Sequence, residues 1–286
     1  MKLSFLNSSN LEPHKIAFYE YGKPSSKAVI LLHAFSHNGF FCNDLAQFLS
    51  ERGIYVICPD MPGRGKSSYL THSKNYNYHL YVDDLFFILN SLKIENATLM
   101  GNSMGGITSI LFKEKFPKLV KKIILNDIGI FIPSDESIRI GSFIGKNMVC
   151  KTQEQIINRI YSELAESNLK SGELKKIFEA YSTHKGDEYI LNYDPKIADA
   201  FWFSTRQKKI PDLDFSDNFQ NIIHSGQPTE FYLIRGQRSN LFDKDSFERM
   251  KKFKNVKAYM EIPNKGHLPL FFSNSQSETI ANWILR

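Results

Sequence analysis

Short apolar runs and longer stretches of helical periodicity take turns over the first 130 residues. The short runs are rich in apolar and β-branched residues, which indicates strands at 14–20, 28–32, 55–58, 97–100 and 121–125. Between them, apolar side chains recur every three to four residues, which indicates helices at 41–51, 78–92 and 104–116. Strands that alternate with helices build a mostly parallel sheet with helices on both faces. We therefore predict an α/β fold.

The alternation stops after about residue 131 and returns near residue 228. Residues 131–227 hold helical stretches, such as 152–164 and 173–181, and no clear strand. Further strands and helices are predicted at 230–235, 244–252, 256–262 and 275–285. We predict a core of residues 1–130 and 228–286, into which residues 131–227 are inserted as a helical lid. Four aromatic residues could form an apolar pocket wall or the core of the lid: Tyr181, Phe201, Trp202 and Phe203.

Composition limits the class of protein. The chain has 286 residues, 42% of them hydrophobic and 13% aromatic, which is enough apolar surface for an ordered core. Its cysteines, Cys42, Cys58 and Cys150, are too few and too far apart for a disulfide framework or a paired-cysteine metal site. The sequence starts without a signal-peptide core, and no run approaches the roughly 20 apolar residues that span a bilayer. We expect a cytoplasmic protein.

The net charge of +6 raises the question of an anionic partner. The lysines are spread along the chain among aspartates and glutamates, which is typical of a solvated surface. A nucleic-acid-binding protein would carry a basic stripe with aromatic stacking residues or a recognisable binding module, and the sequence has neither. We expect the partner to be a small molecule, and the sequence carries no indication of an oligomeric state.

The sharpest chemical signal is the segment 101–105, Gly-Asn-Ser-Met-Gly, between a predicted strand and a predicted helix. It fits the Gly-x-Ser-x-Gly pattern, in which small residues permit a tight turn that exposes a strained serine. The helix that begins after the serine directs N–H groups and its positive end toward a developing oxyanion. We predict Ser103 as the nucleophile and the Met104 N–H as an oxyanion donor. The alternative is a purely structural glycine turn.

A second signal, His33-Ala34-Phe35-Ser36-His37, directly follows the predicted strand 28–32. We predict that the backbone N–H of Phe35 supplies the second oxyanion donor, and that His33 holds the loop by hydrogen bonds. The two histidines leave a strand rather than sharing a helix face with a glutamate, so we expect no zinc site. No cofactor is expected.

His267 lies in a loop after the last predicted strand, in the segment 264–269, Asn-Lys-Gly-His-Leu-Pro. A histidine there could take the proton of Ser103, as general-base chemistry requires. A lone histidine is usually a surface or core residue. Because this one follows a serine turn and stands near the C-terminus, we predict it as the base.

Together with residues 60–67, these motifs resemble the α/β-hydrolase superfamily over nearly the whole chain. Residues 60–67, Asp-Met-Pro-Gly-Arg-Gly-Lys-Ser, are similar to a turn of its esterase, epoxide-hydrolase, dehalogenase and carbon-carbon-hydrolase branches. The resemblance implies an eight-stranded-type, mostly parallel twisted sheet flanked by helices, with an inserted helical lid. A serine at position 103, where dehalogenases and epoxide hydrolases carry aspartate, implies acyl transfer through a serine ester.

The third member of a catalytic triad is harder to find. Many relatives carry an aspartate after the strand that follows the lid, and here Asn240 stands in that place. Asparagine cannot stabilise an imidazolium ion. We favour Asp127, because the segment 123–127, Ile-Ile-Leu-Asn-Asp, ends the strand that follows the nucleophile helix, and some branches of the superfamily place their acid there. Asp243 and a site without a working acid are the alternatives, and Asp127 could also be a turn or helix-cap carboxylate.

Three functions follow from these residues. The first is a carboxylesterase-like serine hydrolase that cleaves a small or medium ester-type substrate through Ser103, His267 and Asp127 and an acyl-enzyme. The second is a carbon-carbon bond hydrolase of a diketone or dienoate, which would use the same serine and histidine. The third is a binding protein that kept the fold after its triad degraded.

Overall fold

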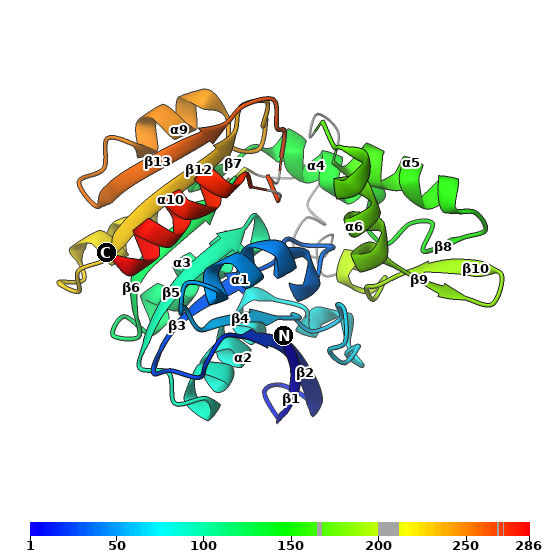
Figure 1. Cartoon of the computed structure of the whole chain (residues 1–286), viewed down its shortest axis with the longest axis horizontal. Coiled ribbons are helices and arrows are strands. Elements are labelled where there is room, and N and C mark those ends of the chain that lie inside the picture. Colours follow the sequence, from blue (N-terminus) through cyan, green and yellow to red (C-terminus); the bar gives the residue numbers. More distant parts are fainter. Residues whose placement is uncertain (165–167, 200–211, 268, 271) are drawn as a thin grey trace.

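A computed structural model of the chain describes residues 1–164, 168–199, 212–267, 269–270 and 272–286. Its centre is an eight-stranded sheet in the order β1-β2-β4-β3-β5-β6-β12-β13 (Figure 1). The strands are β1 (Lys2–Ser8), β2 (His14–Tyr21), β3 (Lys27–Leu32), β4 (Val56–Pro59), β5 (Asn96–Asn102), β6 (Val120–Asn126), β12 (Glu230–Gly236) and β13 (Val256–Ile262). All neighbours from β4 to β13 pair in parallel, and β2 runs antiparallel to β1 and β4.

Helices cover both faces of this sheet. One face carries α1 (Asn43–Ser50) and α10 (Asn274–Leu285), and the other carries α2 (Tyr78–Ser91), α3 (Met104–Lys115), α8 (Ser216–His224) and α9 (Lys244–Met250). The inner strands are buried on both sides, so successive side chains of β3 enter different cores: Ile30 packs in one and Leu31 in the other. The predicted mostly parallel sheet between two helical layers is confirmed. In the described part of the chain, no helix combines the length and apolar character needed to cross a membrane.

The first strand, β1, was not predicted. It pairs with β2 over seven residues, from Lys2 opposite Glu20 to Ser8 opposite His14. It lies at the edge of the sheet, where Leu3 and Phe5 remain 39% and 46% exposed. Pairing with β2 rather than burial of an apolar face makes this segment a strand, and its hydrophobic pattern is correspondingly weak.

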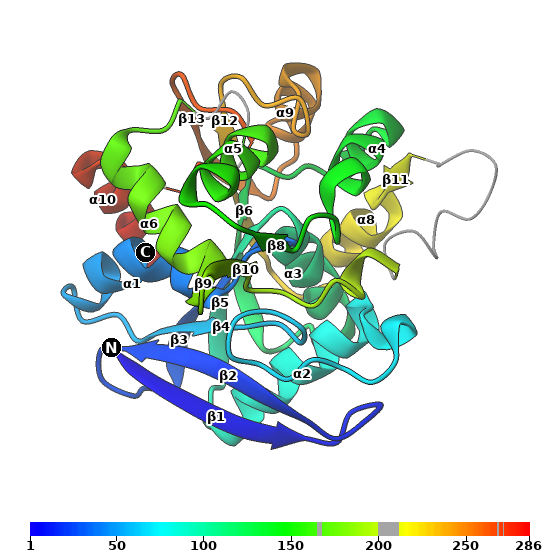
Figure 2. The same cartoon turned by 90° about the vertical axis from the view of Figure 1, so that its right-hand side faces the viewer.

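The segment between β6 and β12 contains α4 (Ser134–Phe143), α5 (Gln153–Glu163) and α6 (Ser171–Tyr181), which stand beyond one end of the sheet (Figures 1 and 2). The expectation of no strand in residues 131–227 is wrong. The described part of this range contains five short strands: β7 (Phe131–Ile132), β8 (Val149–Cys150), β9 (Ser182–Lys185), β10 (Glu188–Leu191) and β11 (Leu213–Asp214). The hairpin β9–β10 is mostly exposed and therefore lacks an apolar alternation. It closes through a two-residue turn at Gly186, whose φ of +61° suits a tight hairpin.

Candidate active site

Ser103 occupies a sharp bend between β5 and α3. Its backbone angles, φ 50° and ψ −114°, are ones that a residue with a side chain rarely adopts. The bend is held by the Ser103 N–H, which donates to the carbonyl of Asn126 at 3.2 Å. A Cβ atom at position 101 would lie 2.2 Å from the main chain of Gly105, so only glycine fits there. The tight turn that the sequence predicts is present, and its strain is enforced by the surrounding main chain.

His267 and Asp127 meet at the carboxyl ends of the parallel strands. The Nδ1 atom of His267 lies 2.7 Å from Oδ2 of Asp127. The Asp127 side chain is completely buried, and that of His267 is 11% exposed. Because the carboxylate accepts a hydrogen bond from Nδ1, it favours the tautomer in which Nε2 is the nitrogen able to take up a proton.

The Asp127 carboxylate is fixed from two further directions. Oδ1 accepts from the backbone N–H of Gly236 at 2.8 Å, and Oδ2 accepts from Oγ of Ser239 at 2.8 Å. The backbone of Asp127 has a φ of 55° and its N–H donates to the carbonyl of Ile234. The groups that hold Asp127 in these contacts therefore come from β12 and the loop that follows it. Sequence reasoning did not identify Ser239, although it follows the strand on which the acid was sought.

The two other candidate acid positions have different surroundings. Asp243 is the N-cap of α9, where Oδ1 accepts from the N–H of Ser246 at 2.7 Å and Oδ2 from its hydroxyl at 3.2 Å. Asn240 is exposed in the loop between β12 and α9. The carboxylate hydrogen-bonded to His267 is that of Asp127.

Ser103 and His267 line one cavity of about 30 Å³. Ala34 and Phe35 of the loop after β3 belong to the same wall, and α4 and the end of α5 close the opposite side with Ile140, Phe143 and Leu164. A volume of this size holds about one or two water molecules, not an ester. Residues of α4 and of the end of α5 thus line the cavity beside Ser103.

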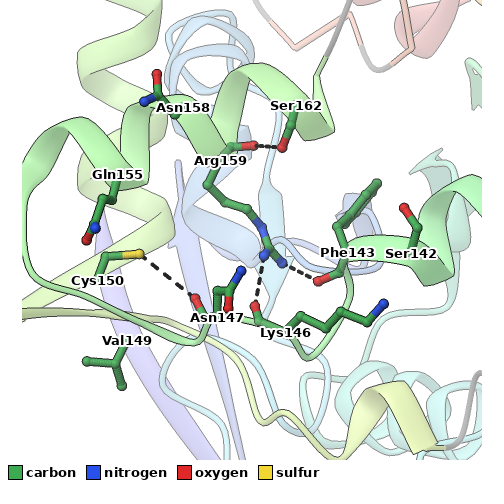
Figure 3. A pocket seen from close by; sticks show the side chains of 10 residues that line it. All are labelled: Ser142, Phe143, Lys146, Asn147, Val149, Cys150, Gln155, Asn158, Arg159 and Ser162. Atoms are coloured by element: carbon green, nitrogen blue, oxygen red, sulfur yellow. Dashed lines mark hydrogen bonds between the residues drawn. The ribbon is translucent and has the colours of Figure 1, made fainter.

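A larger cavity of about 620 Å³ lies within the inserted segment (Figure 3). It is lined by residues of α4, α5 and the chain between them, among them Lys146, Cys150 and Asn158. Arg159 crosses it to donate to the main-chain carbonyls of Phe143 and Lys146 (Figure 3). Because neither Ser103 nor His267 belongs to its wall, we assign the chemistry to the smaller cavity.

Of the four aromatic residues considered for a pocket wall, the structure describes Tyr181, which is not among the residues that line the small cavity. Tyr181 is buried in the main core, with its ring at an edge-on angle to Phe41, 6.4 Å between centroids. Phe201, Trp202 and Phe203 lie outside the residues that the structure describes. Among the described residues, the apolar wall of the small cavity comes instead from Ile140 and its neighbours.

The loop after β3 is braced by buried hydrogen bonds. His33 Nδ1 lies 2.7 Å from the carbonyl oxygen of Ala34, and Nε2 accepts from the N–H of Met61 at 2.9 Å. Burial lowers the pKa of His33 to about 3, so the ring is neutral at physiological pH. These contacts match the loop-holding role expected for it. The fully buried Arg64 donates from Nε to the carbonyl of Phe35 at 2.9 Å, a contact that the sequence did not predict.

Of the two predicted oxyanion donors, Phe35 lies in the loop after β3 and Met104 lies at the start of α3. Phe35 lines the cavity with Ser103, and Arg64 fixes the peptide on its C-terminal side. Met104 is the first residue of α3, so its N–H has no acceptor within the helix. The assignment of these two N–H groups to an oxyanion stays a prediction.

Asn126 connects the residue before the serine to the loop that carries the histidine. Its Nδ2 donates to Oδ1 of Asn102 at 2.5 Å and to the carbonyl of Pro269 at 2.9 Å. Both partners are acceptors, so the amide nitrogen rather than the oxygen faces them. Its main-chain carbonyl also accepts from the Ser103 N–H, and Asp127 follows it in the chain. This one buried residue therefore contacts the segments that carry all three candidate catalytic side chains. Sequence reasoning did not single it out.

In the described ranges, which leave out 165–167, 200–211, 268 and 271, no three histidine, cysteine or acidic side chains gather into a group that could hold a metal ion. His33 and His37, the pair considered from sequence, are both buried.

The chain matches a family model described as alpha/beta hydrolase fold over residues 27–273. A 3-hydroxybutyrate-oligomer hydrolase from Cupriavidus necator is 27% identical over 273 residues, which cover 92% of this chain and 90% of that protein. A serine hydrolase-like protein from Dictyostelium discoideum is 25% identical, over 92% of this chain and 76% of that protein.

Solved structures resemble the chain along its full length. A putative hydrolase from Rickettsia typhi superposes with a TM-score of 0.87 at 24% identity, covering 100% of this chain and 99% of that one. An alpha/beta hydrolase from Novosphingobium aromaticivorans superposes with a TM-score of 0.86 at 21% identity, covering 99% of this chain and 98% of that one. At these identities the likeness concerns the fold.

Proposed function

Because the chain belongs to the α/β-hydrolase fold family, we propose that it is a carboxylesterase-like serine hydrolase acting on small or medium ester-type substrates. The observation that carries the proposal is that His267 Nδ1 lies 2.7 Å from Asp127 Oδ2, while the same histidine lines a cavity with Ser103. A serine at a strained turn, a histidine and a buried carboxylate are the three groups that nucleophilic acyl transfer requires.

In the proposed reaction, Nε2 of His267 takes the proton of the Ser103 hydroxyl as the oxygen attacks the ester carbonyl. The N–H groups of Phe35 and Met104 bind the oxyanion of the tetrahedral intermediate. The intermediate collapses when His267 returns the proton to the departing alcohol, leaving the acyl group on Ser103. Water, deprotonated by His267, then releases the acid and restores the serine. Asp127 keeps the ring oriented and stabilises its cationic form throughout.

The names of similar proteins support hydrolysis of esters. The Cupriavidus protein, similar over most of both chains, is named for oligomers of a hydroxy acid, and the Dictyostelium protein is named as serine hydrolase-like. The buried carboxylate beside His267 counts against the alternative of a binding protein with a degraded triad, because that alternative rested on a missing acid. Three buried free cysteines are consistent with a reducing, cytoplasmic location.

We propose that residues 131–227 act as a lid. The cavity above Ser103 holds about 30 Å³, which is less than any ester requires, and α4 and α5 supply one side of it. Substrate therefore reaches the serine when these helices shift away from the loop after β3, and residues of both then line the enlarged cavity around it. Lid movement of this kind commonly excludes water during reaction.

The test is a comparison of Ser103→Ala and His267→Ala with wild type on p-nitrophenyl esters of increasing chain length. Ser91→Ala, an exposed serine at the end of α2, is the matched control. We expect both site variants to lose at least about three orders of magnitude in kcat and the control to keep its activity. Hydrolysis of a dienoate ring-cleavage product with no turnover of any ester would replace the proposal with carbon-carbon bond hydrolysis. Full activity in Ser103→Ala would contradict both.

A further inference from the structure

One end of the small cavity is polar, and the proposed mechanism does not use it. Ser36, His37 and Glu163 form this end, since Ser36 Oγ lies 3.4 Å from Glu163 Oε2 and His37 follows Ser36 in the chain. The rest of the lining includes the apolar Ile140, Phe143 and Leu164 and the charged Arg139. Ser36 and His37 belong to the loop after β3, and Glu163 is the last residue of α5. The polar end therefore joins the sheet core to the inserted segment, immediately beside the residue that we assign to the carbonyl oxygen.

His37 is held in place by contacts of its ring with two aromatic rings and by a hydrogen bond of its backbone. Its imidazole stacks on Phe41 with 4.0 Å between centroids and 6° between planes, and the edge of Tyr181 lies 6.3 Å away. Its backbone N–H donates to the carbonyl of Ala34 at 3.1 Å. Nδ1 is buried and has no hydrogen-bond partner among the described residues. A buried ring nitrogen without a partner is unfavourable unless a ligand supplies one.

The imidazole of His37 is neutral, since burial lowers its pKa to about 3. A neutral imidazole has one nitrogen that accepts a hydrogen bond and one that donates. It therefore suits an uncharged polar group that can do both.

Glu163 is a buried carboxylate whose pKa is raised by burial, an effect that the neighbouring Arg159, Tyr181 and Ser36 oppose. Arg159 donates to Oε1, while Oε2 lies 3.4 Å from the hydroxyl of Ser36, a long distance for a hydrogen bond to a carboxylate. Arg159 itself donates to the carbonyls of Phe143 and Lys146 (Figure 3). It also donates to the hydroxyl of Tyr193 at 3.1 Å. The carboxylate is thus fixed in direction, and a better donor than Ser36 could engage Oε2.

From this arrangement we infer that the polar end binds a hydroxyl group of the substrate, so that the preferred substrates are hydroxylated esters. The inference rests on the proposed ester hydrolysis and adds the substrate class. A hydroxyl donates to Glu163 or His37 and accepts from Ser36 or His37. Glu163 would repel a carboxylate in the same position. A cation would not be attracted there, because Arg159 already balances the charge of Glu163. Since Ser36 directly follows Phe35, the hydroxyl lies within a few bonds of the scissile carbonyl.

The test compares ethyl 3-hydroxybutyrate and 2-hydroxyethyl butyrate with ethyl butyrate, by titration of the released acid. Wild type is expected to prefer at least one hydroxylated ester by about tenfold in kcat/KM. His37→Phe keeps a ring to stack on Phe41 but removes both nitrogens, and it should abolish that preference. Ser36→Ala, which removes a single oxygen, should lower it. Ser91→Ala, an exposed position at the end of α2, is the control and should leave the ratio between substrates unchanged.

Two outcomes overturn the inference alone: wild type hydrolyses ethyl butyrate without preferring either hydroxylated ester, or His37→Phe slows all three substrates equally. Thermal unfolding of each variant establishes that it is folded, and Ser36→Ala decides the matter if His37→Phe does not fold. A folded wild type that hydrolyses none of the three esters, nor any p-nitrophenyl ester, overturns the proposed function and this inference with it.

Discussion

Replacement of Asp127 by asparagine tests the contacts on which the histidine depends. In the structure the carboxylate faces three hydrogen-bond donors: Nδ1 of His267, the N–H of Gly236 and the hydroxyl of Ser239. An asparagine has one acceptor oxygen and one donor nitrogen. If its nitrogen faces His267, the ring must present a lone pair at Nδ1, and the proton moves to Nε2. If its oxygen faces His267, its nitrogen meets the Gly236 N–H, donor against donor.

The first orientation removes the base from the reaction, because a protonated Nε2 cannot accept the proton of Ser103. The corresponding change in a serine protease lowers kcat about 10⁴-fold. That factor equals about 5.5 kcal/mol of lost transition-state stabilisation. We expect a fall in kcat of this order for Asp127→Asn, with KM changed less than about threefold.

Steady-state kinetics on a p-nitrophenyl ester measure both constants. Asp243→Asn is the matched control, since asparagine caps a helix as well as aspartate does and should preserve both activity and stability. If folded Asp127→Asn keeps more than about a tenth of the wild-type kcat, the carboxylate does not orient the catalytic histidine and the reasoning is refuted.

Three further substitutions follow from the same contacts. Asn126→Ala removes the amide that joins Asn102 to Pro269, so kcat should fall about 10- to 100-fold with little change in KM, and unchanged kcat would contradict its positioning role. Asn240→Asp should leave kcat within about twofold, because Asp127 already meets His267; a large gain in the same assay would mean that position 240 is the better acid site. His37 is neutral when buried but protonates in the unfolded chain, so its contribution to stability is lost as pH falls from about 6.5 toward 3. Urea unfolding between pH 7 and pH 5 should therefore show a loss of stability that is smaller in His37→Phe by about 1 kcal/mol per pH unit, and equal losses would contradict the burial argument.

Features that depend on neighbours in sequence were predictable. The turn around Ser103 requires small residues two positions before and after the serine, and both requirements are visible in the letters alone. The inner strands of the central sheet are buried on both faces, so their apolar runs stand out clearly in the sequence. β1 and the hairpin β9–β10 were missed because they are exposed and carry no such pattern.

The candidate acid shows where sequence reasoning stops. Asp127 and Gly236 are 109 residues apart, and only the parallel pairing of β6 with β12 brings the carboxylate to the N–H that fixes it. The sequence could therefore rank Asp127 above Asp243 only through a resemblance. Asn126 was missed for the same reason, since its partners lie 24 and 143 residues away. The polar end of the cavity also required the structure, because Ser36 and Glu163 are separated by 127 residues.

The measurement closest to the central claim is the site of covalent modification by a fluorophosphonate, which reacts with serines activated by a neighbouring base. Peptide mass spectrometry of the wild-type protein should find a single adduct, on Ser103, and the His267→Ala protein should remain unmodified. An unmodified wild-type Ser103, or an adduct that forms equally well without His267, would contradict the pairing of these two residues.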